Sequence, residues 1–167
     1  MRQLPIQRGY ENGEIFPYRG KHFELALVNE TPAGAKVTPD GGRLLVCADK
    51  AECARQLILY WYTAETENIA RSLVPAWSKK LAVRPRAVTV KYARTRWGSC
   101  AASGNIFLNS RLAMLSVEVG EYIVVHELCH LKQMNHGPEF WDEVKRALPL
   151  AMTLRLSLRE QERAAVL

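Results

Sequence analysis

One run of five residues, His126-Glu127-Leu128-Cys129-His130, constrains what this chain can fold into more than any other part of the sequence. Residues four apart in an α-helix lie about 40° apart around its axis and one turn apart along it, so both imidazoles leave the same face. Two imidazoles with that spacing can bind one zinc ion through nitrogens at about 2.0–2.1 Å. Glu127 lies off that face and can reach a water on the ion but not the ion itself. The sequence therefore predicts a helix that carries a zinc site.

A catalytic zinc site also needs a third protein ligand and one open position. The chain has only 4 histidines, and one of them, His136, follows six residues after His130. In a continuous helix His136 would point about 240° away from His130, so the helix must end between them if both bind one ion. Asn135, Gly137 and Pro138 are residues that end one helix and begin the next. We therefore predict that His136 completes the ligand set.

Two other interpretations of this segment stay open. Glu139 and Glu143 lie just downstream and are alternative third ligands. The histidines could also belong to an ordinary surface or core helix in which they only pair with neighbouring side chains.

The N-terminal part of the sequence predicts strands followed by a long helix. Residues 14–29 have the pattern of a β-hairpin, 30–40 that of a polar loop, and 43–47 that of a short strand. Asp49 with Glu52 three residues later has the form of a capping box, which predicts a helix start. Apolar residues then recur near helical spacing to about Val74, and Pro75 is expected to interrupt the helix before it resumes to about Leu81.

The C-terminal part predicts strands and then helices. Residues 83–93 are expected to form a strand, 94–103 a loop, and 104–108 a second strand after a glycine turn. Ser116 can cap a helix that runs to about Gln133 and contains the first two histidines. Residues 139–164 have the pattern of one or two amphipathic helices.

The length of 167 residues predicts a single domain, 1–167, with residues 1–12 extended or poorly ordered. No apolar stretch approaches the roughly 18 residues of a membrane span, and residues 1–13 lack the apolar core of a secretory signal. The 4 cysteines form no C-x-x-C pair and are expected to be free thiols in a reducing compartment. We therefore expect a cytoplasmic protein that does not act at a membrane.

Positive charge is concentrated in one segment. Residues 79–117 contain eight basic and no acidic residues, while the rest of the chain has a slight negative balance. A segment without acids creates a positive potential that attracts anions. This favours a small anionic substrate or, alternatively, nucleic acid as a partner. The ordinary explanation, a solvated face of mixed origin, remains available.

Several motifs together resemble one known family. They are Arg94–Cys100, Gly104–Asn109, Tyr122–Leu131, Asn135-His136 and Phe140-Trp141. They resemble the YgjP-like family of zincin-type metal-dependent hydrolases, which are related in architecture to SprT- and WLM-type metalloproteases. The resemblance runs from about residue 13 into the C-terminal helices and is loose over 148–167. Members often carry an extra N-terminal β segment, which this sequence is expected to lack.

The resemblance implies an α+β, zincin-like fold with a small mixed or antiparallel sheet, an active-site helix and packed C-terminal helices. It implies zinc on His126, His130 and His136, with Glu127 as the general base. It also implies an edge strand beside the active-site helix that pairs with peptide substrates, for which 106–108 is the natural candidate.

Three side chains next to that strand, Arg94, Arg96 and Ser99, are candidates to stabilise the oxyanion of a transition state. Structural roles, such as Arg96 stacking on Trp97, are the alternative.

The function expected from these features is zinc-dependent hydrolysis of a peptide or protein, in which a water on zinc attacks and Glu127 accepts its proton. One alternative is a nucleotide pyrophosphatase, for example acting on UTP, in which arginines hold the phosphates. Another is a nucleic-acid-associated, SprT-like protease or binding module that uses the basic segment. The sequence does not indicate an oligomeric state.

Overall fold

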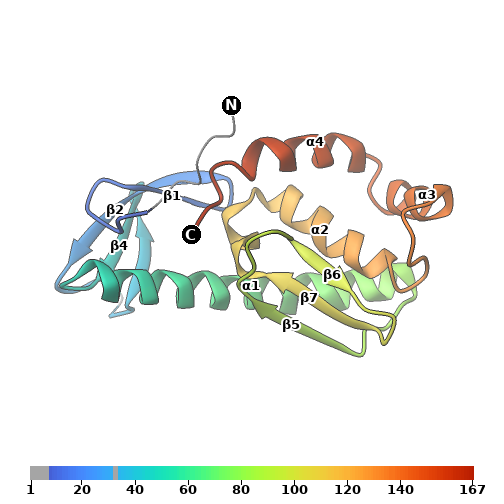
Figure 1. The fold of residues 1–167 in the computed structure, drawn as a ribbon, viewed down its shortest axis with the longest axis horizontal. Helices are drawn as coiled ribbons and strands as arrows, with labels where there is room; N and C mark the ends of the chain where they lie inside the picture. Colours follow the sequence, from blue (N-terminus) through green and yellow to red (C-terminus); the bar gives the residue numbers. More distant parts are fainter. Residues whose placement is uncertain (1–7, 32–33) are drawn as a thin grey trace.

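The computed structural model describes residues 8–31 and 34–167. Within them the chain forms two small β-sheets and four α-helices, arranged along one long helix, α1 (Ala51–Leu81) (Figure 1). The first sheet lies at one end of α1, and the second sheet and the remaining helices lie along its other half (Figure 1). The predicted α+β fold class is confirmed. Among the described residues, no helix combines the length and hydrophobicity that a membrane crossing requires.

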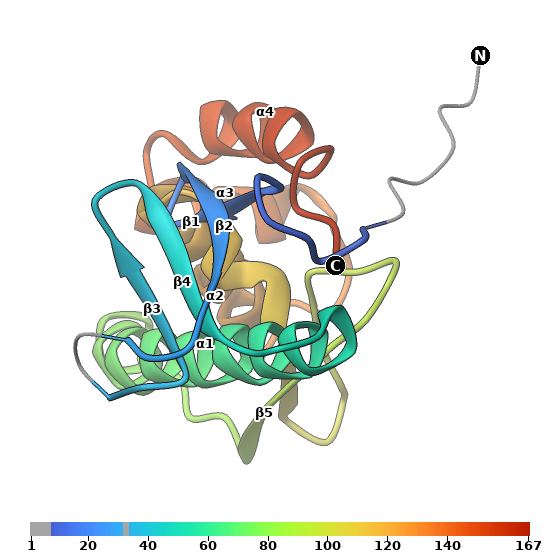
Figure 2. The ribbon, with the colours of Figure 1, turned by 90° about the vertical axis from the view of Figure 1, so that its left-hand side faces the viewer.

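The first sheet has the strand order β1-β2-β4-β3 and lies in front of α1 in Figure 2. Its strands are β1 (Ile15–Tyr18), β2 (Lys21–Val28), β3 (Val37–Asp40) and β4 (Arg43–Cys47). The β1–β2 and β3–β4 pairs are antiparallel, and β2 and β4 are parallel. The predicted hairpin and the strand at 43–47 are confirmed.

The predicted polar loop at 30–40 is wrong in its last part, because Val37–Asp40 form β3. Pro39 is tolerated there since β3 lies at an edge of the sheet, where a strand can lack an N–H donor. Residues 32–33 of the predicted loop lie outside the described residues.

The N-terminal residues 8–12, which were predicted to be extended or poorly ordered, lie outside any helix or strand but contact the folded core. Tyr10 is buried and its ring packs 5.7 Å from that of Phe16. Arg8 donates hydrogen bonds to the carbonyl oxygens of Ile15 and Val166, at 2.8 and 2.6 Å. Residues 8–12 are therefore anchored to both β1 and the C-terminal segment, while residues 1–7 lie outside the described residues.

Helix α1 begins and continues differently from the prediction. Its N-cap is Lys50, which makes no side-chain capping hydrogen bond, so the predicted capping box is wrong; Glu52 pairs with Arg55 instead. The helix also continues through Pro75 without interruption. Pro75 has no N–H to donate to the carbonyl four residues earlier, so one helix hydrogen bond is missing. Ala70 and Trp77, on either side of the proline, are buried and keep the apolar face of the helix packed.

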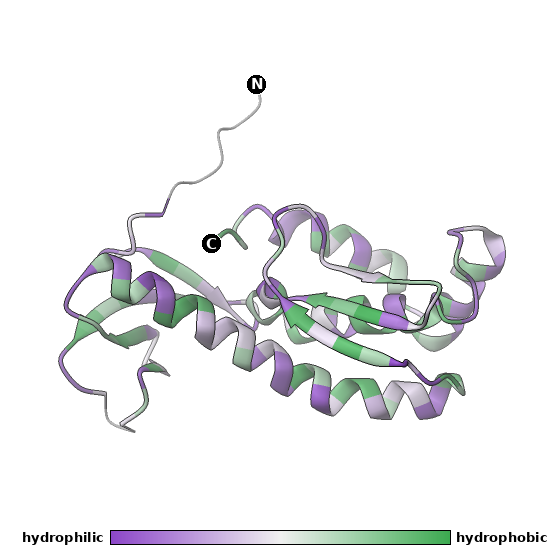
Figure 3. Ribbon diagram, turned by 60° about the horizontal axis from the view of Figure 1, so that its bottom comes forward, coloured by the Kyte–Doolittle hydropathy of each residue, from purple (hydrophilic) through white to green (hydrophobic). Residues whose placement is uncertain are grey.

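Figure 3 shows hydrophilic and hydrophobic residues alternating along α1, as expected of a helix with one face on the core.

The second sheet has the order β5-β7-β6, with β5 (Ala87–Lys91) parallel to β7 (Asn105–Asn109) and β6 (Gly98–Cys100) antiparallel to it. The predicted edge strand, 106–108, is therefore wrong, because β7 is central and β6 is the edge strand that packs against helix α2. Residues 98–100 were expected in a loop because Gly-Ser-Cys is too short to show strand periodicity.

Helix α2 (Val117–Cys129) follows a short 3-10 helix, Ser110–Met114, and begins as predicted, with Ser116 Oγ accepting from the backbone N–H of Val119 at 3.4 Å. It ends at Cys129, earlier than the predicted Gln133. The C-terminal region forms two helices, α3 (Pro138–Ala147) and α4 (Ala151–Gln161), and Pro138 lies in the first turn of α3 as predicted. Both α3 and α4 pack against α2.

Asn109, at the end of β7, fixes the loop that leads into β6. Its side chain is fully buried, and Nδ2 donates to the carbonyl oxygens of Ala93 and Arg96, each at 2.6 Å. Its Oδ1 accepts from the backbone N–H of Arg111 at 3.0 Å. One amide thus positions the start of the edge strand.

We expect Asn109→Ala to lower the free energy of unfolding by about 2–4 kcal/mol, because it leaves these buried backbone groups unpaired. Urea denaturation followed by circular dichroism measures this. The matched control is Asn105→Ala, since Asn105 is exposed at the other end of β7 and its loss should cost less than about 0.5 kcal/mol. Equal losses in the two variants would contradict the role of Asn109.

Candidate metal centre and active site

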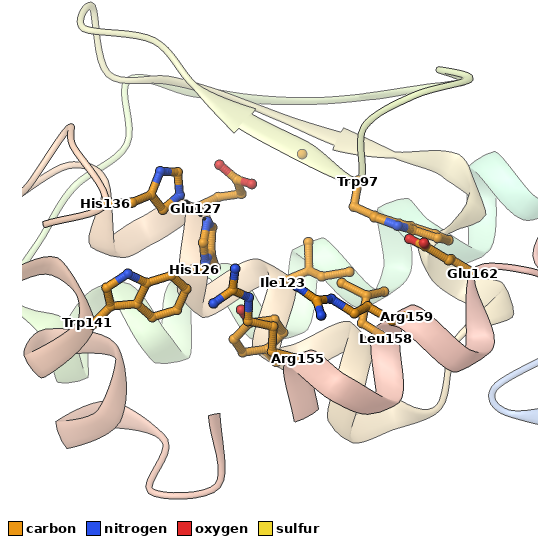
Figure 4. A pocket seen from close by; sticks show the side chains of 12 residues that line it. Trp97, Ile123, His126, Glu127, His136, Trp141, Arg155, Leu158, Arg159 and Glu162 are labelled. Carbon is orange, nitrogen blue, oxygen red and sulfur yellow. Dashed lines mark hydrogen bonds between the residues drawn. The ribbon is translucent and has the colours of Figure 1, made fainter. Parts of the chain in front are cut away.

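The three histidines singled out by the sequence lie together at the end of α2. His126 is in its last turn, His130 is its C-cap, and His136 comes from the turn that leads to α3. Their candidate ligand atoms all lie within 4.8 Å of one another, and Nε2 of His126 is 3.0 Å from Nε2 of His136. Figure 4 shows the rings of His126 and His136 side by side at one end of a cavity.

The end of α2 also sets the orientation of His130. The chain turns where the N–H groups of Leu131 and Gln133 donate to the carbonyls of Leu128 and Cys129, both at 3.1 Å. His130 Nδ1 lies 3.0 Å from the carbonyl oxygen of Gln133. Because a carbonyl can only accept, Nδ1 carries the proton and Nε2 keeps its lone pair.

Aromatic rings of α3 support the three imidazoles. Phe140 is fully buried and stacks on His130, with ring centroids 4.4 Å apart and planes at 24°. Its ring also contacts His126 and His136 edge-on, at 4.9 and 4.8 Å. Trp141 lies 5.9 Å from each of these two rings. The aromatic pair therefore packs α3 against the site.

Burial keeps the imidazoles of His126 and His130 neutral. Burial, followed by the nearby His130, His136 and Arg155, lowers the pKa of His126 to about 3. Burial also lowers the pKa of His130. Neutral imidazole is the form that binds metal. Two nitrogens bound tetrahedrally to one ion at about 2.0–2.1 Å lie roughly 3.3 Å apart, close to the His126–His136 separation. The residues present therefore fit a divalent cation such as zinc.

Other candidate ligands are engaged elsewhere. Glu143 pairs with Lys132 and Arg146, each at 2.5 Å, and these contacts lower the pKa of its carboxyl. Glu139 is exposed, and among the described residues neither glutamate joins the histidine group. Cys129 is fully buried, and burial raises the pKa of its thiol to about 12, so it does not present a thiolate.

Glu127 lies against the edge strand. Its side chain is 6% exposed, and burial raises its pKa to about 7. A Cβ on Gly98 would lie 2.7 Å from both Cγ and Oε1 of Glu127. Position 98 therefore has to be glycine for the carboxyl group to lie where it does, between α2 and β6.

A cavity of about 710 Å³ extends from the histidines between β6, α2 and α4 (Figure 4). It is bordered by the following residues of the edge-strand region, α2, α3 and α4: Trp97, Gly98, Tyr122, Ile123, His126, Glu127, His136, Trp141, Arg155, Leu158, Arg159 and Glu162.

The predicted oxyanion-stabilising residues do not line this cavity. The Arg96 guanidinium lies 5.4 Å from the ring of Phe107, and Arg94 is exposed. Ser99 follows Gly98 in β6, so its side chain points to the opposite face of the strand. The guanidinium that lies over the Trp97 ring is that of Arg111, whose Cζ is 4.7 Å from the ring centroid, and not that of Arg96.

The arginines that line the cavity are Arg155 and Arg159 of α4, which the sequence analysis did not single out. Their spacing of four residues was the available signal, but it is also that of any amphipathic helix.

We expect the protein to bind about one zinc ion per chain. His136→Ala should lower the zinc affinity at least about 100-fold, because loss of a side chain that only hydrogen-bonds to a metal ligand already lowers metal affinity 10–100-fold. Zinc titration against a chromophoric chelator, with metal analysis, measures both. The control is His22→Ala, since His22 is exposed on β2 and far from the cluster in sequence. Equal zinc affinity in both variants would contradict the ligand assignment.

No curated protein sequence matches the chain. The fold is similar to the crystal structure of the metallopeptidase zymogen of Pyrococcus abyssi abylysin, with a TM-score of 0.50 and 21% identity over 61% of this chain and 99% of that one. The corresponding zymogen of Methanocaldococcus jannaschii jannalysin gives a TM-score of 0.49 and 20% identity over 58% and 89% of the two chains.

The sequence model of one family, described as "YgjP-like, metallopeptidase domain", matches residues 1–161. The match includes all three histidines and Glu127. It begins at residue 1, whereas the sequence resemblance was expected to begin at about residue 13. The chain belongs to the YgjP-like family.

Proposed function

We propose that this protein is a zinc-dependent metallopeptidase that uses Glu127 as its general base. The observation that carries the proposal is the juxtaposition of three imidazoles with a buried carboxyl group, beside an edge strand and a cavity. Membership of a family described as a metallopeptidase domain supports the same reaction class.

The histidines would hold the ion through His126, His130 and His136. A zinc ion bound there supplies Lewis-acid polarisation of the scissile carbonyl and lowers the pKa of a water toward ~7. Phe140 and the Gln133 carbonyl keep the rings in place, so the ligands need little rearrangement on binding.

Glu127 would accept a proton from the attacking water and later deliver it to the leaving amine. A pKa near 7 suits a group that must do both at neutral pH, and burial is what raises it. Gly98 contributes by leaving room for this carboxyl group.

Strand β6 would bind the substrate backbone. It pairs with β7 on one side, and within the described residues its other edge has no strand partner. An extended peptide can pair with such an edge by main-chain hydrogen bonds. Since Gly98 of β6 touches Glu127, a peptide bound there would pass close to the base.

A nucleotide pyrophosphatase remains the second candidate, because Arg155 and Arg159 in the cavity could bind phosphates. In the sequence, the pyrophosphatase was favoured by the basic segment at 79–117. Arg94 and Arg96 of that segment do not line the cavity. The peptidase is therefore the better-supported proposal.

We expect the zinc-loaded protein to cleave an unstructured protein such as casein, and Glu127→Gln to lower the rate about 10³-fold while zinc binding is kept. Gel and mass-spectrometric assays, with and without chelator, measure this. Glu139→Gln is the matched control and should keep full activity, because Glu139 is exposed and outside the cavity. Full activity of Glu127→Gln would contradict the assignment. Pyrophosphate release from nucleotides without proteolysis would favour the second candidate.

We expect Gly98→Ala to lower proteolysis about 10- to 100-fold while zinc affinity stays within a few-fold, because the new methyl group must displace the Glu127 carboxyl group. The free energy of unfolding of Gly98→Ala should be lower by about 1–3 kcal/mol, because the added methyl group overpacks the space between β6 and α2. The control is Ser99→Ala, whose side chain points to the other face of β6 and should leave activity unchanged. Wild-type activity in Gly98→Ala would show that Glu127 does not act from its observed position.

A further inference from the structure

One side of the cavity is formed by helix α4 and carries two positive charges. Arg155 and Arg159 lie four residues apart, so they leave the same face of the helix about one turn apart. Leu158 lies between them, and Glu162 follows one turn further on, near Trp97 (Figure 4). We call these four residues the α4 wall. Like charges at this spacing destabilise a helix slightly, so the pair brings no stability of its own.

Neither guanidinium is neutralised by the protein. Among the described residues, Arg155 and Arg159 form no ion pair and no side-chain hydrogen bond, whereas Arg146 of α3 pairs with Glu143. Arg155 is half-buried and Arg159 is exposed. Two unpaired cations that border one cavity are available to a ligand, and partial burial strengthens the interaction at Arg155.

Arg155 lies beside the candidate metal centre. Its Cζ is 4.8 Å from the centre of the Trp141 ring, and that ring is 5.9 Å from the rings of His126 and His136. In Figure 4 the Arg155 guanidinium points toward His126, and Glu127 lies on the other side of that imidazole. Stacking on Trp141 restricts the guanidinium and holds it near the site of hydrolysis.

The two arginines match the repeat of an extended peptide. Residues 155 and 159 are separated by about 6 Å along the helix axis. Side chains on one face of a strand repeat every two residues, at about 6.6 Å. A peptide that pairs with β6 would therefore present alternate side chains to the α4 wall, first at Arg155 and then at Arg159.

We propose that Arg155 and Arg159 make the enzyme selective for peptides with an acidic side chain within about two residues of the scissile bond. This inference rests on the proposed function and names its substrate class. The carboxylate binds to Arg155, or to Arg159 one turn away, by charge-assisted hydrogen bonds. Glu162 limits the preference to these positions, because it places a negative charge at the far end of the α4 wall.

The test uses the zinc-loaded full chain and quenched fluorogenic peptides that differ only in Glu, Gln or Lys at the two positions on either side of the bond. We expect kcat/KM to be about tenfold higher for Glu than for Gln at one of these positions, and the difference to shrink with added salt. In the double variant Arg155→Gln/Arg159→Gln the ratio should approach one. Charge reversal, Arg155→Glu/Arg159→Glu, should favour the Lys peptide.

The matched control is Arg163→Gln, which removes the same charge just beyond α4 at an exposed position outside the cavity, and it should keep the tenfold ratio. A terminal carboxylate is a second source of the same chemistry, so each peptide is also made as its C-terminal amide. A preference that survives amidation supports the proposal, and one that disappears overturns it. A preference that survives in Arg155→Gln/Arg159→Gln also overturns it, as does a wild type that cleaves the Glu and Gln peptides equally well.

A binding measurement separates this inference from the proposed function. Fluorescence anisotropy with Glu127→Gln, which binds peptide without cleaving it, should show a Kd about tenfold lower for the Glu peptide than for the Gln peptide. This difference in affinity should be lost in the triple variant Glu127→Gln/Arg155→Gln/Arg159→Gln. If the wild type cleaves no peptide but this selectivity is found, the proposed function fails and the selectivity of the α4 wall stands. Equal binding of the two peptides, or tighter binding of a nucleoside triphosphate than of the Glu peptide, overturns the inference.

Discussion

The site depends on where helix α2 stops. If the helix continued past His130, His136 would point away from the other two imidazoles, and no ion could contact all three. The chain instead turns at Leu131–Gln133, and the Gln133 carbonyl that this turn brings round accepts the proton of His130 Nδ1. This hydrogen bond at the end of the helix thus fixes the tautomer of His130, one of the three candidate ligands. Buried Phe140 stacks on His130 and contacts His126 and His136 edge-on, so one ring packs against all three imidazoles.

The rest of the cavity is assembled from parts that are distant in sequence. Helix α2 supplies the carboxyl group of Glu127, β6 supplies a glycine that makes room for it, and α4 supplies the cations opposite. Asn109 and Arg111 link these parts, because Asn109 holds the loop before β6, and Arg111 donates from its guanidinium to the carbonyls of Arg94 and Ala165. The loop before β6 and the segment after α4 are therefore both hydrogen-bonded to residues 109–111.

The clustering of the three histidines could be predicted from the sequence, whereas the cavity around them could not. A ligand pair at helical spacing and a helix-ending segment are local features, so His126, His130 and His136 could be grouped without knowing the fold. The edge strand could not be found in this way, because Gly98–Cys100 become a strand only by pairing with β7. Arg155 and Arg159 were missed for a similar reason: only the packing of α4 against α2 brings them to the cavity. The acid-free segment contributes Trp97 and Gly98 to the cavity, but its Arg96 lies on Phe107 instead of in the site.

The central claim, that three imidazoles hold one catalytic zinc ion, is tested most directly by X-ray absorption at the zinc edge on protein loaded with one equivalent of the metal. We expect a first shell of nitrogen and oxygen at about 2.0–2.1 Å, together with outer-shell scattering from three imidazoles. A sulfur scatterer at about 2.3 Å, or scattering from fewer than three imidazoles, would contradict it.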